Sequence, residues 1–244
     1  MLVLASASPR RRELLTQAGF TFQVHPAHIP EDPLPSEDPI AYVTRLARQK
    51  AETVFAELSM KGTGFSPYIE PSEEKRALAP EASPSTSQQP LGAPGPGSPR
   101  TGLRPWGGDS SPLGTWETSN SSLVCLGADT TVTLDNHILA KPEDEADAAR
   151  MLRLLSGRTH HVITGVAIIT ATRTEVAAEV TAVRFLTLSD ADIAAYIATG
   201  EPMDKAGAYA IQGLAARWIP RIHGDYFNVV GLPLALVTTM LEFL

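Results

Sequence analysis

The sequence contains little cysteine, few aromatic residues and no long hydrophobic run. Its single cysteine, Cys125, excludes an intramolecular disulfide and a cysteine-based zinc site. Because Cys125 lies in the apolar run 123–126, we expect a buried strand residue rather than a nucleophile. The longest apolar stretch, residues 229–244, is too short to span a bilayer and carries Pro233 and Glu242. No signal peptide is visible, so the sequence predicts a soluble cytoplasmic protein without membrane contact.

The chain also lacks an excess of positive charge and the common nucleotide-binding and hydrolase motifs. The net charge is -7, and an acidic chain is not expected to bind nucleic acid. No G-x-x-x-x-G-K-[ST] loop and no G-x-G-x-x-G after a strand occur, so neither a Walker loop nor a Rossmann site is predicted. The missing H-E-x-x-H and G-x-S-x-G motifs leave a zinc protease and a serine hydrolase unsupported. The adjacent His160 and His161 face opposite sides of a predicted strand and cannot bind one metal together.

Composition divides the chain into a globular part and one long insertion. Residues 60–122 hold 10 of the 20 prolines and 9 of the 18 glycines. Such a segment buries too little apolar surface to offset its ordering entropy, so we predict a disordered insertion within a single domain, residues 1–244. Trp106 and Trp116 leave open the alternative that the insertion docks a partner, although long surface insertions are well tolerated.

The remaining residues alternate between β-rich and helical patterns, which predicts an α/β fold with a mixed sheet. We expect strands at residues 2–5, 20–26, 123–128, 131–134, 138–140, 161–170 and 175–188. We expect helices from Pro9 to Gly19, from Pro39 onward, from 143 to 155, from the capping box at Ser189 to near Gly200, and from Pro233 onward. In the second helix the apolar spacing predicts core positions at Ile40, Val43, Leu46, Ala47 and Val54. Residues 224–233 are predicted to form a tight turn.

Two arginines, Arg10 and Arg11, follow a predicted strand and two serines at the start of a helix. A helix N-terminus offers free N–H groups and positive partial charge, which suit a phosphate. Because the helix dipole disfavours arginine there, the pattern indicates that an anion binds. The alternative is an exposed basic helix start that Ser8 caps in the ordinary way.

Asp129 follows the apolar strand predicted at 123–128, at the end where ligands bind in open α/β sheets. A carboxylate at that place can hold a divalent metal or accept a proton from water. The alternative is a turn aspartate that caps a neighbouring amide. Lys50, Lys141 and Lys205 each look like surface lysines when taken alone, but together with the arginines they would neutralise a triphosphate.

Seven ordered segments together resemble the Maf family of nucleotide pyrophosphatases, also called septum-formation inhibitor proteins. They read SASPRRRELL, RLARQKA, GADTTV, AKP, LSGRTHHVITGVA, GEPMDKAGAYAIQG and HGDYFNVVGLPL, and they cover nearly the whole chain outside 60–122. The resemblance implies an elongated α/β fold with a groove between two lobes, similar to inosine-triphosphate pyrophosphatases. It also implies a house-cleaning hydrolase of nucleotide metabolism that uses a divalent metal cation, Mg²⁺ or Mn²⁺, and frequently forms homodimers.

The resemblance implies roles for individual residues as well. The catalytic set is Asp129, Glu31 and Lys50, with Asp129 as proton acceptor and with Asp129 and Glu31 as metal ligands. Pro30 stands before Glu31, where the family often has a second acid. The phosphate-binding and substrate-binding residues are Ser8, Arg10, Arg11, Lys50, Lys141 and Lys205. The specificity residues are Arg10, Thr130, Lys141 and Gln212, in the combination of the dTTP/UTP-preferring branch.

The sequence therefore predicts a nucleoside-triphosphate pyrophosphatase that hydrolyses dTTP, UTP and modified pyrimidine triphosphates to the monophosphate and pyrophosphate. Gln212 would read the edge of the base through paired hydrogen bonds. The alternative is a non-catalytic, nucleotide-binding regulator of cell division or septum formation. The acid pair of Glu31 and Asp129 argues against this alternative, because binding alone does not need two metal-placing acids.

Overall fold

The structure is a computed structural model that describes residues 1–60 and 122–244. The predictions of disorder in the insertion and of docking through Trp106 or Trp116 fall on residues 61–121, which lie outside the described part. The fold and the candidate site are therefore built from the two described ranges.

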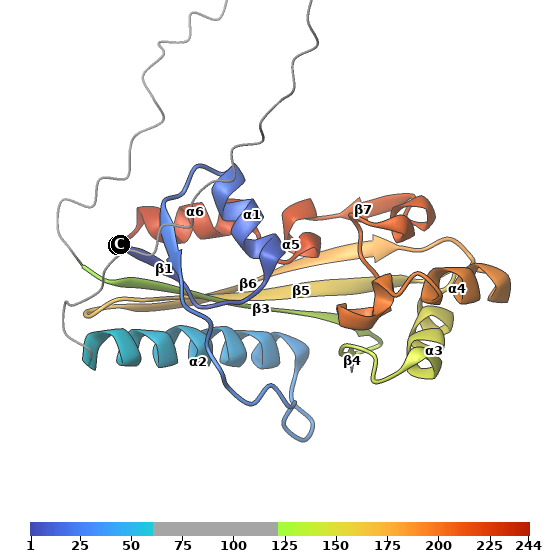
Figure 1. Ribbon diagram of the computed structural model, residues 1–244, viewed down its shortest axis with the longest axis horizontal. Coiled ribbons are helices and arrows are strands. Elements are labelled where there is room, and N and C mark those ends of the chain that lie inside the picture. Colours follow the sequence, from blue (N-terminus) through green and yellow to red (C-terminus); the bar gives the residue numbers. More distant parts are fainter. Residues whose placement is uncertain (61–121) are drawn as a thin grey trace, which may run out of the picture. The chain divides into compact units, whose positions relative to one another are not determined.

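One seven-stranded mixed sheet forms the centre of the described residues (Figure 1). Its strands are β1 (Leu2–Leu4), β2 (Phe22–Val24), β3 (Val124–Leu134), β4 (His137–Leu139), β5 (Thr159–Ile169), β6 (Thr174–Arg184) and β7 (Arg221–His223). The order is β2-β1-β3-β5-β6-β7, and β4 pairs with β3 beside this path. Strand β1 is parallel to β2 and β3, whereas the other pairs are antiparallel. The predicted mixed α/β sheet is confirmed.

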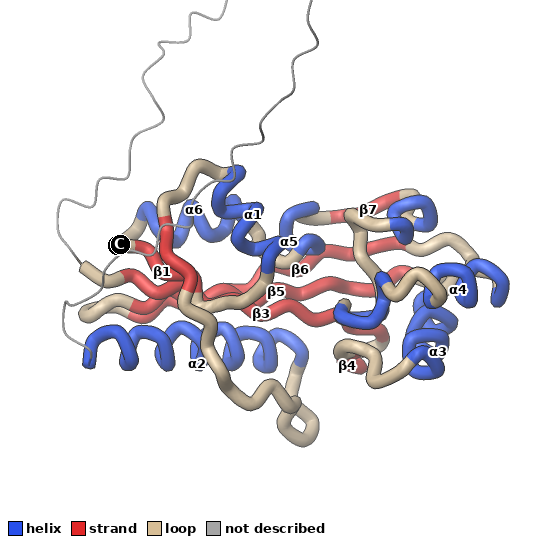
Figure 2. The backbone as a smooth tube through the Cα atoms, viewed as in Figure 1, coloured by secondary structure: helices blue, strands red, loops and turns tan. Residues whose placement is uncertain are grey.

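Helices cover both faces of the sheet (Figures 1 and 2). They are α1 (Pro9–Gln17), α2 (Pro39–Met60), α3 (Glu145–Leu155), α4 (Asp190–Ile197), α5 (Tyr226–Val230) and α6 (Leu234–Glu242), with 3₁₀ turns η1 (Glu201–Asp204), η2 (Ala206–Ala208) and η3 (Leu214–Trp218). Helix α2 lies along one face of β3 and β5, while α1, α5 and α6 lie on the other face. In the described ranges, no helix combines the length and the apolar character that crossing a membrane requires.

Side chains of β3 alternate between these two faces, as the period of a strand requires. Cys125 is fully buried and packs with Ala47 on the α2 face, which confirms its prediction as a core residue. Leu126 packs in the cluster on the opposite face. By the same alternation, Asp129 points toward α2 and Thr130 points toward α1 and α5.

Helix α2 rests directly on the sheet at two glycines. A Cβ at Gly127 would lie 2.1 Å from the carbonyl oxygen of Ala47, and a Cβ at Gly165 would lie 2.4 Å from that of Val43. No side chain separates the helix from β3 and β5 at these points. The close approach brings Lys50, which is buried on the same helix, against β3.

A second apolar core packs α3 and α4 against the ends of β3, β5 and β6 near β4. His160 is fully buried there, in T-shaped contact with Phe185 at 5.1 Å and with Tyr209 at 5.3 Å between ring centroids. Its Nε2 shares a 2.7 Å hydrogen bond with the Tyr209 hydroxyl, while Nδ1 has no partner among the described residues. His161 is exposed on the other face, as predicted.

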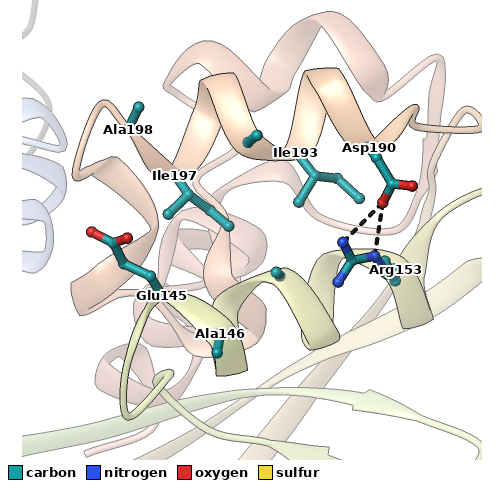
Figure 3. Close-up of a pocket in the computed structure, with 9 residues that line it drawn as sticks. Glu145, Ala146, Arg153, Asp190, Ile193, Ile197 and Ala198 are labelled. Atoms are coloured by element: carbon teal, nitrogen blue, oxygen red, sulfur yellow. Dashed lines mark hydrogen bonds and ion pairs between the residues drawn. The ribbon is translucent and has the colours of Figure 1, made fainter.

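A pocket of about 360 Å³ lies between α3 and α4 (Figure 3). Small and apolar side chains such as Ala146, Ile193 and Ile197 line it, and Arg153 pairs with Asp190 at 2.9 Å across one end. None of the residues predicted for the active site lines this pocket. The groove between two lobes that the resemblance implies stays a prediction.

The local signals for helix and turn boundaries are largely confirmed. Ser189 forms the predicted capping box of α4, and Asp135 and Asn136 form the hairpin turn with positive φ. The prediction of Ile40 as a core residue is wrong: it is 45% exposed, because the first turn of α2 buries Pro39 and Tyr42 instead.

The prediction that residues 224–233 form only a tight turn is also wrong. The segment contains the short helix α5, whose first turn is capped by the Asp225 carboxylate. The carboxylate accepts a 2.7 Å hydrogen bond from the backbone N–H of Phe227. An aspartate in a Gly-Asp pair suits both a turn and a helix cap, and the apolar residues that follow it pack on β5 and β6.

Adding one methyl group at Gly165 should destabilise the fold because α2 would have to move off the sheet. We expect Gly165→Ala to lower the free energy of unfolding by at least about 2 kcal/mol, as for other overpacked cores. Gly19→Ala is the control: its methyl group enters open space at φ +80°, so it costs only the strain of a left-handed backbone, about 1 kcal/mol. Urea unfolding of both variants measures the difference, and equal losses would contradict the close approach.

Acid should weaken the fold through His160. Burial, with a smaller contribution from His161, lowers the pKa of His160 to about 3. The unfolded chain therefore binds one more proton than the folded chain between pH 6.5 and 3, and stability falls as pH drops through this window. Between pH 7.5 and 5, wild type should lose about 2 kcal/mol more than His160→Phe in urea unfolding. Parallel pH profiles of the two proteins would contradict this prediction.

Candidate active site

Two carboxylates and one lysine meet beside the middle of β3. The Lys50 ammonium lies 2.7 Å from Asp129 Oδ1 and 2.6 Å from Glu31 Oε1. Lys50 and Asp129 are each only 7% exposed, whereas Glu31 is on the irregular segment between β2 and α2 and half of its side chain reaches solvent. The Tyr42 hydroxyl fixes that segment by donating a 2.8 Å hydrogen bond to the Glu31 carbonyl oxygen. The three residues predicted as the catalytic set are thus in direct contact.

The prediction that Asp129 ends its strand is wrong. Strand β3 continues to Leu134 because residues 125–133 pair with β5 without a break. Along its other edge, β3 pairs with β1 only at residues 124–126 and with β4 only at residues 132–134. Residues 127–131 therefore meet no strand on that side within the described ranges. The candidate site occupies this free edge of β3.

The two acids have opposite pKa shifts. Burial raises the pKa of Asp129, and the charges of Lys50 and Arg11 offset only part of this effect. Partial burial also raises the pKa of Glu31, but the hydrogen bond and charge of Lys50, with help from Lys141 and Arg11, lower it overall. Asp129 is thus the stronger proton acceptor of the two carboxylates.

Arg11 is held rigidly on the opposite face of β3. Its Nε donates to the Gly231 carbonyl oxygen at 2.9 Å, Nη1 to Ser6 Oγ at 3.1 Å, and Nη2 to Thr130 Oγ1 at 3.1 Å. A guanidinium carries five N–H donors, so two remain for a ligand. Burial lowers the pKa of Arg11, and the nearby Asp129 carboxylate opposes that shift.

A buried polar network supports Thr130 from behind. Thr130 Oγ1 lies 2.9 Å from Thr164 Oγ1, which donates to the Asn228 carbonyl oxygen at 3.1 Å. The Asn228 amide donates to Val162 O at 3.0 Å and to Thr181 Oγ1 at 2.9 Å. These supporting residues could not be predicted from the sequence, because no local pattern shows which threonine of one strand will contact a residue of another strand.

Within the described ranges, no hydrogen bond or ion pair joins the remaining predicted residues to the Lys50, Asp129 and Glu31 centre. Lys141 is exposed, and its charge adds to the larger effect of Lys50 in lowering the pKa of Glu31. The hydrogen bond and charge of Lys205, with a smaller contribution from Arg10, lower the pKa of the Asp204 carboxylate.

Ser8 stands at the N-cap position of α1, but its side chain makes no capping hydrogen bond. Its backbone N–H instead donates to Ser6 Oγ at 3.2 Å. The alternative interpretation, in which the Ser8 side chain caps the helix in the ordinary way, is therefore wrong. Gln212 is exposed on a turn that precedes η3.

Glu31 and Asp129 are the described site residues whose chemistry fits a divalent cation. Glu31 and Asp129 converge on one positive centre, the ammonium of Lys50, so their oxygens can address a common cation. Among the described residues, no group of three or more histidine, cysteine or acidic side chains is arranged to hold a metal ion. One or two carboxylates completed by phosphate oxygens and water is the arrangement typical of Mg²⁺.

Comparison with known proteins gives consistent matches over the whole chain. A family model described as Maf-like protein matches residues 1–244. The chain is 42% identical over 241 residues to the dTTP/UTP pyrophosphatase of Koribacter versatilis, covering 99% of this chain and 93% of the relative. It is 42% identical over 238 residues to the protein of the same name from Geobacter sulfurreducens, with 97% and 92% coverage. The dTTP/UTP pyrophosphatase of Bacillus pumilus is 36% identical over 241 residues, with 99% and 95% coverage.

The contact between Lys50 and Asp129 should appear as a strong energetic coupling. Lys50→Met leaves two carboxylates without their cation, so we expect a loss of about 3 kcal/mol in the free energy of unfolding. In an Asp129→Asn background the same change should cost at least about 1 kcal/mol less. A matched cycle with Arg153→Met and Asp190→Asn, an exposed pair, should give coupling near zero. Additive losses at Lys50 and Asp129 would contradict the geometry.

Proposed function

The chain belongs to the family of Maf-like proteins, and on this premise we propose that it is a nucleoside-triphosphate pyrophosphatase. Its relatives are named dTTP/UTP pyrophosphatases, so we propose dTTP, UTP and modified pyrimidine triphosphates as its substrates. The products are the monophosphate and pyrophosphate. The observation that carries this proposal is the convergence of Asp129 and Glu31 on Lys50 at the free edge of β3.

Asp129 is the proton acceptor in this proposal. A water molecule beside its carboxylate attacks the α-phosphorus, the bond to the β-phosphate oxygen breaks, and pyrophosphate leaves. The burial that raises the pKa of Asp129 makes it a better base than an exposed aspartate. Lys50 keeps the carboxylate oriented, because its ammonium is bound between Asp129 and Glu31.

Cationic side chains would neutralise the triphosphate. Arg11 has two free N–H donors and is fixed by three hydrogen bonds, so it can bind a phosphate oxygen without losing side-chain freedom. Arg10, Lys141 and Lys205 would stabilise charge on the leaving group, with Ser8 at the start of α1. Most of the catalytic effect in phosphoryl transfer comes from such positioning and charge.

Glu31 and Asp129 would hold a divalent cation, Mg²⁺ or Mn²⁺, together with phosphate oxygens. The chemistry that the cation supplies when bound is charge neutralisation and polarisation of the phosphoryl group. The exposed half of Glu31 is the side from which a substrate complex can approach.

The base would be selected by Arg10, Thr130, Lys141 and Gln212. Gln212 has an exposed amide that can donate to one group of a pyrimidine edge and accept from its neighbour. A wrong base leaves these groups unpaired, at a cost of about 1–3 kcal/mol.

The alternative of a non-catalytic regulator gains no support, since the matched relatives carry the names of enzymes. Homodimer formation and a cytoplasmic location stay predictions. Light scattering of the purified chain tests the first of them.

Pyrophosphate release from a panel of triphosphates tests the proposed function. We expect release from dTTP, UTP and 5-methyl-UTP with Mg²⁺ or Mn²⁺, little from CTP, ITP or 7-methyl-GTP, and none with EDTA. Asp129→Asn should lower kcat by about 10²- to 10⁴-fold, the usual share of general base catalysis. Asp135→Asn, the same change at an exposed turn of the same hairpin, should leave kcat unchanged.

The outcomes separate the parts of the proposal. Near-wild-type turnover by Asp129→Asn would remove the assigned base but keep the reaction. A preference for 7-methyl-GTP would keep the reaction and contradict the specificity residues. No release from any triphosphate would overturn the proposed function.

A further inference from the structure

The turn that carries Gln212 is closed by its own backbone. The N–H of Gly213 donates to the carbonyl oxygen of Ala210 at 3.1 Å. Gln212 is exposed within this turn, and its side-chain amide has no hydrogen-bond partner in the described ranges. The turn therefore presents a free amide to a ligand, and its usefulness depends on how firmly the turn is held.

The carboxylate of Glu201 is packed against the far end of this turn. The N–H of Leu214 donates to both of its oxygens, at 3.1 Å each. A Cβ at Gly213 would lie 2.0 Å from Glu201 Oε1, so only a glycine lets the carboxylate come this close to the backbone. Glu201 thus contacts the residues that directly follow Gln212.

Tyr196 of α4 links Glu201 to the other end of the turn. Its hydroxyl donates to Glu201 Oε1 at 2.7 Å and accepts from the N–H of Ala210 at 3.2 Å. The ring is 1% exposed and packs on Trp218 in a T-shaped contact of 5.3 Å. Burial, with the Glu201 hydrogen bond, raises the pKa of Tyr196, so the hydroxyl keeps its proton and its role as donor.

Glu201 is itself fixed. Its backbone N–H donates to Thr199 Oγ1 at 3.2 Å, and Thr199 Oγ1 donates to the Tyr196 carbonyl oxygen at 2.6 Å. The next residue, Pro202, is buried. A partly buried acid with these fixed partners is a built support of the turn rather than a solvated surface charge.

We propose that Glu201 and Tyr196 are positioning residues that hold the turn 210–214, so that Gln212 meets the pyrimidine base in one orientation. This inference rests on the proposed function, in which Gln212 reads the base. Uracil and thymine present an N–H donor beside a carbonyl acceptor, whereas cytosine presents an acceptor beside an amino donor. If the Gln212 amide can rotate or move, it can pair with the edge of uracil or thymine and also with the edge of cytosine. On a fixed turn the amide is restricted to one of these edges.

Selectivity is the property to measure. The ratio of kcat/KM for dTTP to kcat/KM for dCTP should fall about tenfold in Glu201→Ala, Tyr196→Phe and Gln212→Ala. This is the effect expected when one hydrogen bond that distinguishes the two bases is lost. Turnover of dTTP should change less than this ratio, because the catalytic acids are untouched. The double variant Glu201→Ala/Gln212→Ala should lose no more selectivity than Gln212→Ala alone. Glu145→Ala, an exposed acid in α3, should keep the wild-type ratio.

A second readout does not need a nucleotide. Amide hydrogen exchange at Ala210 and Leu214 should be faster in Tyr196→Phe than in wild type. Tyr196→Phe keeps the buried ring, so it can still be tested if Glu201→Ala does not fold. An unchanged exchange rate overturns the inference, and so does a wild-type selectivity ratio in folded Glu201→Ala. A loss in Glu201→Ala that adds to the loss in Gln212→Ala overturns it as well. If wild type releases pyrophosphate from no triphosphate, the proposed function fails with the selectivity claim, while exchange still decides whether Tyr196 holds the turn.

Discussion

The candidate site depends on the direct contact between the backbone of α2 and the sheet. Gly127 and Gly165 leave no side chain between the helix and the strands, so the helix lies as close as its carbonyl oxygens allow. Lys50 is one turn beyond Ala47, which touches Gly127, and its side chain therefore reaches Asp129 two residues further along β3. A helix held farther out would leave Asp129 buried without a cation, at a cost of several kcal/mol for an unpaired buried charge.

The free edge of β3 gives groups on the two faces of the sheet a route to the same proposed site. Asp129 with Lys50 and Glu31 lies on the α2 side, and Thr130 with Arg11 lies on the α1 side. A continuous sheet would separate these two sets. Because β1 and β4 pair with β3 only beyond residues 127–131, side chains from the two faces can meet around the open edge. Open α/β sheets usually bind ligands at the carboxyl ends of their strands. Within the described ranges, the candidate site here lies instead beside the unpaired edge of β3 at residues 127–131.

Much of the fold could be predicted from local signals, and much of the site from the resemblance. The capping box at Ser189 and the turn at Asp135 depend only on neighbouring residues, and both are confirmed. The extent of β3 could not be read locally, because its continuation past Asp129 is decided by pairing with β5, about thirty residues away in sequence. The sequence also indicated Lys50 as a cation for phosphate, while tertiary contacts give it two acids as partners. Gly213 and Glu201 form their contact only once the chain has folded.

The placement of Asp129 and Thr130 as consecutive residues on opposite faces has a consequence for how such a chain can diverge during evolution. Point substitutions at residue 130 change the hydroxyl network around Arg11 and leave the acid and ammonium contacts on the other face in place. The insertion or deletion of a single residue between Leu126 and Asp129 would exchange the two faces and remove both sets at once. A substitution at residue 130 therefore alters contacts on one face of the strand, whereas a change in the number of residues in the strand disturbs the contacts on both faces together.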